Sequence, residues 1–209
     1  MNKENIISGL IGFAIGIFLT SVFTPFGGTM MGNRSGMDRD DDKYSRQGGM
    51  MGSIDAHFIE QMIPHHEGAV AMATLALQKS THAEVKTLAS AIIESQTKEI
   101  DDMTAWYKQW FGKDVPEASM GMMKGGMMFE SGMHMGGDED MTALETAADF
   151  DKAFLEAMIP HHQMALMMVQ MLESGTDRPE MLQLAKNISV SQSKEIQDMQ
   201  GWYKAWYGK

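Results

Sequence analysis

A methionine followed three and four residues later by two adjacent histidines occurs twice in the chain, in Met-Ile-Pro-His-His at 62–66 and at 158–162. If these segments are helical, residues three and four positions apart share one face, so each methionine lies beside both histidines. Imidazole with thioether suits copper above the other common metals, because the soft thioether favours Cu(I) and imidazole binds both oxidation states. The sequence therefore predicts copper ligands, for which Ag(I) would be a mimic of Cu(I), at Met62, His65, His66, Met158, His161 and His162.

Further methionines and one histidine extend this set of candidate ligands. Four methionines follow the second motif on neighbouring rows of the same helix, at Met164, Met167, Met168 and Met171. The segment 114–141 carries clustered methionines and the run Met-His-Met, which are either weak acquisition sites for Cu(I) or Ag(I) or part of a linker of biased composition. The additional predicted ligands are Met164, Met168, Met133, His134 and Met135.

Ordinary core packing is the alternative for the histidines of the two motifs. A single buried histidine whose nitrogen atoms find partners needs no metal, but two adjacent pairs with methionine at the same spacing favour a metal site. Pro64 and Pro160 are expected inside the helices, where a proline removes one backbone hydrogen bond and kinks the helix. Glu60 and Glu156 are candidate oxygen ligands, which would favour Cu(II).

The two motifs belong to a longer duplication. Their offset is 96 residues (158 − 62), and at this offset 27 of the 59 paired positions are identical, too many for chance similarity. In each copy, apolar residues recur at three- and four-residue steps along two segments, which predicts two amphipathic helices. The sequence therefore predicts one helical hairpin at 54–113 and a second at 142–209.

Polar residues mark the expected ends and the inner faces of these helices. Thr81-x-x-Glu84 and Thr142-x-x-Glu145 have the pattern of a capping box at a helix start. Two polar pairs lie on or beside the apolar stripe of the second helices, Gln96 with Glu99 and Gln192 with Glu195. They either orient the histidine rings, or form contacts without a metal role.

The positions of the seven histidines give further expectations. His66 and His162 lie in the apolar stripes, so a two-fold bundle should bring them together near its axis. His57 and His82 have no histidine counterpart in the other copy and are expected at the surface. Copper binding should weaken below about pH 6, where ordinary imidazoles become protonated.

Neither hairpin can bury its apolar stripe alone, so the two are predicted to form one all-α four-helix bundle with a pseudo-two-fold axis. The glycine-rich segment 114–141 is then the crossover between them, and 27–53 is a flexible tether. Residues 1–26 contain an uncharged run long enough for an N-terminal hydrophobic helix, either a membrane anchor or a signal segment. In both cases the bundle is expected on the periplasmic or extracellular side.

Composition disfavours several classes of function. The formal net charge is −11, and nucleic-acid binding needs a basic surface instead. The absence of cysteine excludes disulfides, thiolate zinc sites and iron–sulfur clusters. The 24 methionines outnumber the 9 phenylalanines far beyond what a core needs as flexible filler.

At the paired Ile-Pro-His-His motifs and the Ser-Gln-x-x-Glu-Ile runs at 95–100 and 191–196, the chain resembles the family called domain of unknown function (DUF) 305. It is most similar to the tandem, methionine-rich, copper-binding members, and the resemblance covers 54–113 and 142–209. It implies a ferritin-like four-helix bundle, exported, with the methionine and histidine positions of the motifs as copper ligands. Partners would be copper ions, other copper-handling proteins and, through the N-terminal helix, a membrane.

The leading hypothesis is a copper-sequestering protein of the cell envelope that contributes to copper homeostasis and is not an enzyme. A ferritin-like di-iron oxidase is the first alternative, but such sites need Glu-x-x-His pairs, which the glutamates beside the motifs do not form. A helical bundle without a metal is the second alternative, in which the repeated Met-His spacing has no function.

Overall fold

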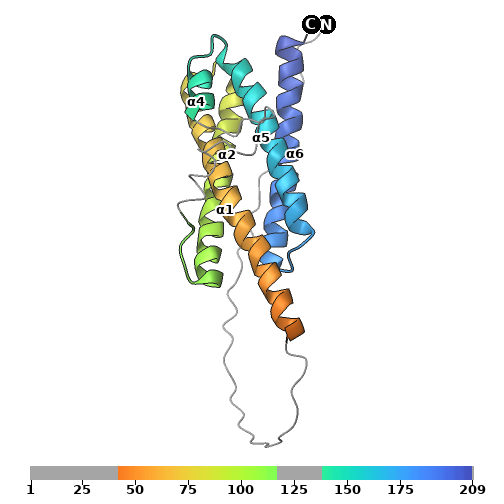
Figure 1. The fold of residues 1–209 in the computed structure, drawn as a ribbon. Coiled ribbons are helices and arrows are strands. Elements are labelled where there is room, and N and C mark those ends of the chain that lie inside the picture. The colour runs from red at the N-terminus through yellow and green to blue at the C-terminus, as the bar shows by residue number, and fades with distance from the viewer. Residues whose placement is uncertain (1–41, 117–137, 209) are drawn as a thin grey trace, which may run out of the picture. The chain divides into compact units, whose positions relative to one another are not determined.

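The structure is a computed structural model that describes residues 42–116 and 138–208. Its helices are α1 (Asp42–Lys79), α2 (Ala83–Phe111), α4 (Asp138–Glu145), α5 (Phe150–Glu173) and α6 (Pro179–Tyr207). Helices α1 and α2 form one hairpin, α5 and α6 form the other, and α1 packs against α5 between the hairpins (Figure 1). Neither described range contains a strand, so the predicted all-α bundle of two helical hairpins is confirmed.

The duplication is visible in the helix boundaries. Helix α6 begins and ends at the positions that correspond to the ends of α2, since 83 + 96 = 179 and 111 + 96 = 207. Gly112 ends α2 in the left-handed conformation, with φ of 68°, and its N–H donates to the carbonyl of Lys108. Glycine adopts this conformation without the steric cost that a side chain imposes.

Both predicted capping boxes are wrong. Helix α2 begins at Ala83, and the N–H and hydroxyl of Thr81 both donate to the carboxylate of Asp151 in the other hairpin. In a capping box the Thr81 N–H would donate to the Glu84 side chain and the hydroxyl would accept, so the contact with Asp151 replaces both local bonds. Thr142 lies inside α4 rather than at a helix start. The second hairpin is capped by Asp149, which accepts a hydrogen bond from the backbone N–H of Lys152.

Three predicted segments extend beyond the described residues. Helix α1 begins at Asp42, inside the predicted tether 27–53, because helix growth adds one hydrogen bond per residue once a turn has formed. Most of the crossover 114–141 and all of the N-terminal segment 1–26 lie outside the described residues. Among the helices that the structure describes, none is long and apolar enough to cross a membrane.

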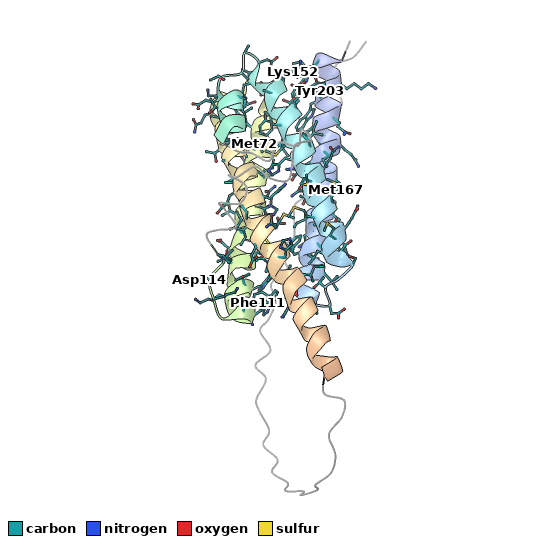
Figure 2. The ribbon with its side chains drawn as sticks, viewed as in Figure 1. Met72, Phe111, Asp114, Lys152, Met167 and Tyr203 are labelled. Atoms are coloured by element: carbon teal, nitrogen blue, oxygen red, sulfur yellow. The ribbon has the colours of Figure 1, made fainter. Side chains whose placement is uncertain are left out.

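The interior of the bundle contains two apolar clusters. We call them the first core, which includes Phe58, Met62, Met103, Tyr107, Val169 and Met181, and the second core, which includes Met72, Leu88, Ile92, Phe154, Met158 and Met199. Each core takes side chains from α1, α2, α5 and α6. The two hairpins run in opposite directions, so α2 ends beside the first core and α6 beside the second, near Phe111 and Tyr203 respectively (Figure 2).

A layer of buried polar side chains separates the two cores. On each of the four long helices, the residues of one core are followed by buried polar residues and then by residues of the other core. We call this the polar layer; its members are His65, His66, Gln96, His161, His162 and Gln192. Each is at most 4% exposed. A protein interior tolerates such a layer only where its polar atoms find partners.

Candidate metal centre

The two Met-Ile-Pro-His-His motifs supply most of the polar layer. Pro64 and Pro160 lie inside α1 and α5, as predicted, so each motif belongs to one continuous helix. Met62 and Met158 are fully buried, one turn before the histidines of their helix. Met62 belongs to the first core and Met158 to the second, so the thioethers flank the layer from opposite sides.

The histidines that meet between the hairpins are His65 and His161. Their ring centroids are 3.7 Å apart, with the ring planes tilted by 38°. The sequence named His66 and His162 as the pair that meets near the axis. This is wrong, because the rings that meet are those of His65 and His161. Adjacent residues on a helix point about 100° apart, so the hydrophobic stripe alone does not fix which histidine of a pair faces the other hairpin.

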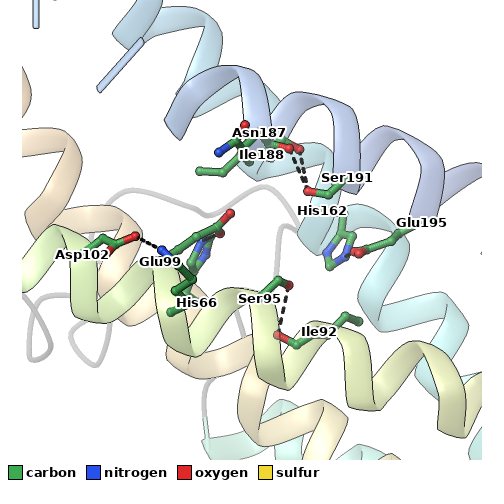
Figure 3. A network of polar contacts seen from close by, with 11 residues as sticks. His66, Ile92, Ser95, Glu99, Asp102, His162, Asn187, Ile188, Ser191 and Glu195 are labelled. Atoms are coloured by element: carbon green, nitrogen blue, oxygen red, sulfur yellow. Dashed lines mark hydrogen bonds and ion pairs between the residues drawn. The ribbon is translucent and has the colours of Figure 1, made fainter. Parts of the chain in front are cut away.

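His66 and His162 instead bind a glutamate of their own hairpin (Figure 3). The Nε2 atom of His66 lies 2.7 Å from Oε2 of Glu99, and Nε2 of His162 lies 2.6 Å from Oε2 of Glu195. The two imidazoles are fully buried, whereas both carboxylates are 15% exposed at the edge of the layer. The sequence left the role of these glutamates open, and the structure places each of them in contact with a buried histidine ring.

Many polar atoms of the layer have no hydrogen-bond partner. They are both ring nitrogens of His65 and of His161, Nδ1 of His66 and of His162, and Oε1 of Gln96 and of Gln192. Leaving a buried polar group unpaired costs about 1–3 kcal/mol, so this arrangement is expensive for a purely structural core. Unpaired imidazole nitrogens beside buried thioethers are suitable donors for a soft metal ion.

Burial keeps the central histidines neutral. It lowers the pKa of His65 to about 3, and the nearby His66 and His162 act in the same direction. Burial and the neighbouring His65 likewise lower the pKa of His161 well below its ordinary value. Neutral imidazole is the form that binds metals. Burial therefore keeps this pair in the metal-binding form below pH 6, and the weaker copper binding expected at that pH stays a prediction.

The layer does not have the donor set of a carboxylate-rich metal site. In the described ranges, no three His, Asp or Glu side chains are grouped closely enough to hold a metal ion. A metal ion in the layer would therefore need the thioethers of Met62 and Met158 in addition to imidazoles. Such a donor set fits Cu(I) and Ag(I), and disfavours Mg²⁺, Ca²⁺ and Mn²⁺.

The other predicted ligands are only partly buried, are exposed, or lie outside the described residues. Met164 and Met168 are half-buried on α5, and Met168 packs against the first core. Met167 is 44% exposed (Figure 2) and Met171 is 68% exposed. Met133, His134 and Met135 lie outside the described residues.

The candidate oxygen ligands Glu60 and Glu156 have a different partner. The hydroxyls of Tyr107 and Tyr203 donate to their carboxylates, in equivalent contacts of the two hairpins. Both contacts join the two helices of one hairpin. These carboxylates therefore serve helix packing in this structure.

A glycine of α1 lies beside the polar layer. A Cβ atom placed on Gly68 of α1 would lie 3.5 Å from Nε2 of His161. The corresponding residue of the second hairpin is Met164, since 68 + 96 = 164. The surroundings of the two central histidines are therefore not identical, although the histidines themselves are.

The turn of each hairpin is held by a contact that the sequence did not reveal. Asp151 accepts from Nδ1 of His82 at 2.8 Å, and the ring of His82 stacks on Trp206 with centroids 3.8 Å apart. Hydrogen bonds from Ser80, Thr81 and His82 outweigh burial and lower the pKa of Asp151 to about 2. We call this the His82 clamp. His57 is exposed as predicted, but His82 is a cross-hairpin contact rather than a free surface residue.

The equivalent contact at the other turn uses arginine. Nε of Arg178 donates to Asp55 at 2.8 Å, and its guanidinium lies 4.1 Å from the ring centroid of Trp110. We call this the Arg178 clamp. All three of its residues are offset by 96 positions from those of the His82 clamp. A signal was present in the sequence, because a cation-capable residue occurs at the same position of both copies.

Comparison with solved structures identifies similar bundles. The chain is 46% identical to CopM in the Cu(I)-bound form, with a TM-score of 0.62, over 74% of this chain and 98% of CopM. CopM is also represented in Cu(II)-bound, Ag-bound and apo forms. A DUF305 fragment from Deinococcus radiodurans is 28% identical, with a TM-score of 0.55, over 71% of this chain and 93% of the fragment.

Comparison of sequences points to the same family. The uncharacterized protein L153 of Acanthamoeba polyphaga mimivirus is 45% identical over 49 residues, which is 23% of this chain and 32% of that protein. The chain thus matches about a third of the length of this relative. The model of the domain of unknown function DUF305 matches residues 55–203, which include the whole polar layer and most of both hairpins. This protein therefore belongs to the DUF305 family.

Proposed function

We propose that this protein binds copper in the polar layer and sequesters it outside the cytoplasm. The ligands would be the imidazoles of the two motifs together with the buried thioethers of Met62 and Met158. Cu(I) is the better match to this donor set, and Cu(II) would use the imidazoles alone. The proposed role is storage or buffering in copper homeostasis and resistance, not catalysis, with the N-terminal segment as anchor or export signal.

The observation that carries this proposal is the set of buried, unpaired imidazole nitrogens between two apolar cores. In a bundle without a metal, the unpaired nitrogens would lower the stability and serve no purpose, because leucine at the same positions would complete the core. The similarity to CopM, which is known in copper- and silver-bound forms, supports the same conclusion.

The di-iron alternative receives no support from the glutamates near the layer. Glu60 and Glu156 accept hydrogen bonds from tyrosines, and Glu99 and Glu195 bind histidine rings at the edge of the layer. Bridging carboxylates that point inward from four helices, as a di-iron site requires, do not occur among the described residues.

A competition titration of the full chain with Cu(I), followed by X-ray absorption at the copper edge, tests the proposal. We expect tight binding with nitrogen and sulfur neighbours. The double variants His65→Ala/His161→Ala and His66→Ala/His162→Ala should each lose most of the affinity while keeping their helicity. His57→Ala, an exposed histidine of α1, is the matched control and should bind as the wild type does. Oxygen-only coordination, or unchanged affinity in both double variants, would disprove the assignment.

A further inference from the structure

We propose that Glu99 and Glu195 are positioning residues that fix the tautomer of His66 and His162, so that Nδ1 of each ring is the copper-binding atom. The inference rests on the proposed function, because it names the atoms through which the same layer would hold its metal. It also adds two residues to the site that lie outside the Met-Ile-Pro-His-His motifs.

The contacts with glutamate locate the ring proton of His66 and of His162. Nε2 of His66 lies 2.7 Å from a carboxylate oxygen of Glu99, and Nε2 of His162 lies 2.6 Å from one of Glu195. An ionised carboxylate only accepts hydrogen bonds. Nε2 must therefore carry the proton and donate it in both contacts.

The other nitrogen of each ring, Nδ1, is in a different environment. Nδ1 of His66 and Nδ1 of His162 are buried and have no hydrogen-bond partner. A proton on Nδ1 would be an unpaired buried donor, which is costly. With the proton on Nε2, Nδ1 of each ring carries a bare lone pair. A bare, buried imidazole lone pair is a ready metal ligand.

The contact between histidine and glutamate occurs in both hairpins. Histidine and glutamate are 33 positions apart in both hairpins, and the two contact distances differ by only 0.1 Å (2.7 − 2.6). In Figure 3, each glutamate reaches its histidine from the second helix of the same hairpin. His65 and His161 have no such partner, and both of their ring nitrogens are unpaired. The carboxylates therefore act on one histidine of each adjacent pair.

The expected effect on the metal follows from this geometry. A carboxylate that accepts from a metal-binding histidine holds the ring in place and makes its other nitrogen a stronger donor. It also adds negative charge next to a layer whose other donors are neutral. Because Glu99 and Glu195 are 15% exposed, they provide this charge without being buried among apolar side chains.

The test compares three variants of the full chain. Glu99→Leu/Glu195→Leu removes both acceptors, whereas Glu99→Gln/Glu195→Gln keeps a side-chain oxygen that still accepts from Nε2. Glu94→Leu makes the same change at an exposed position of α2 and is the matched control. Two measurements are made: the ¹⁵N NMR signature of the histidine rings without copper, and the Cu(I) affinity by competition titration.

In the wild type we expect His66 and His162 to be protonated at Nε2. The Leu variant should lose this preference and bind Cu(I) about 10–100-fold more weakly. The Gln variant should keep the tautomer and recover most of the affinity, and Glu94→Leu should match the wild type in both measurements. The tautomer signal separates positioning from a structural role, since a folded Leu variant that keeps the Nε2 proton would show that the glutamates only support packing.

Three outcomes would overturn the inference, and they are distinguishable. Protonation at Nδ1 in the wild type refutes it without any variant, even if Leu variants fold poorly. Wild-type binding of Cu(I) together with unchanged affinity in the Leu variant refutes the role of the glutamates but leaves the proposed function standing. Absence of Cu(I) binding in the wild type refutes both.

Discussion

The polar layer and the two clamps are duplicated features of the same bundle, but the two copies of each have diverged to different extents. In the layer, the histidines, the glutamines and the glutamates that bind the rings are identical in both hairpins. At the turns, one clamp uses His82 where the other uses Arg178. Cross-hairpin attachment accepts either histidine or arginine, whereas the layer keeps one fixed set of side chains. This difference is expected if the layer binds a ligand and the clamps only hold the two hairpins together.

Acid should affect the layer more than any other part of the molecule. The pKa values of His65 and His161 are lowered in the folded state, while both are ordinary in the unfolded chain. The unfolded chain therefore binds more protons below about pH 6.5, and stability falls as the pH drops from there towards 3. We expect a loss of about 1.4 kcal/mol per pH unit for each of the two histidines.

Chemical denaturation between pH 7 and pH 4, with and without His65→Leu/His161→Leu, measures this slope. The variant should show a much flatter dependence, because its layer has lost the two groups that resist protonation. An equally steep profile in the variant would locate the acid sensitivity elsewhere and remove this contrast between layer and clamps.

Copper should stabilise the fold through the layer alone. A ligand that binds only the folded state at a free concentration of 100 times its Kd adds about 2.7 kcal/mol to the free energy of unfolding. We expect thermal unfolding with Cu(I) to show this gain in the wild type and in His82→Ala. His66→Ala/His162→Ala should show little of it. A comparable loss in His82→Ala would mean that the clamps take part in binding.

The clamps should contribute to stability without affecting copper. Asp55→Ala leaves Arg178 without its partner and Asp151→Ala does the same to His82, so each should cost about 1–3 kcal/mol. Denaturant titration at pH 7 gives these values. The Cu(I) affinity of the folded variants, measured without denaturant, should equal that of the wild type. A copper defect of tenfold or more in either variant would show that turn and layer are coupled.

Exchanging His82 and Arg178 should have the smallest effect. His82→Arg gives the first turn the residue of the second, beside the same kind of carboxylate and tryptophan, so we expect a change below about 1 kcal/mol at pH 7. Arg178→His is the reciprocal variant. A large destabilisation in only one of them, by denaturant titration, would show that the two turns are not mechanically equivalent.

Periodicity predicted the fold because both hairpins place their apolar residues on one face. In α2 the three- and four-residue steps place Val85, Ile92, Gln96 and Met103 on one face, and all four are buried. The duplicated motifs likewise indicated which residues form the centre of the bundle. These features depend on local spacing, which a sequence records directly.

Contacts between the hairpins could not be predicted in the same way. Whether His65 or His66 faces the second hairpin depends on a rotation of α1 smaller than the width of its apolar stripe. The partner of Thr81 is Asp151, 70 positions away, and no local pattern reveals it. The sequence identified Glu99 as polar within the stripe, but only the packing of α2 on α1 shows that it reaches His66.

The glycine at position 68 has a consequence for how the duplication should be understood. It brings α1 close to His161, since a Cβ at this position would be in van der Waals contact with Nε2, whereas the other copy carries Met164 at the corresponding position. The ancestral unit therefore survives as two halves that share their imidazoles but differ in the sulfur and the space around them. The bundle is therefore not fully symmetric, and each half can acquire its own affinity for copper and its own rate of copper exchange.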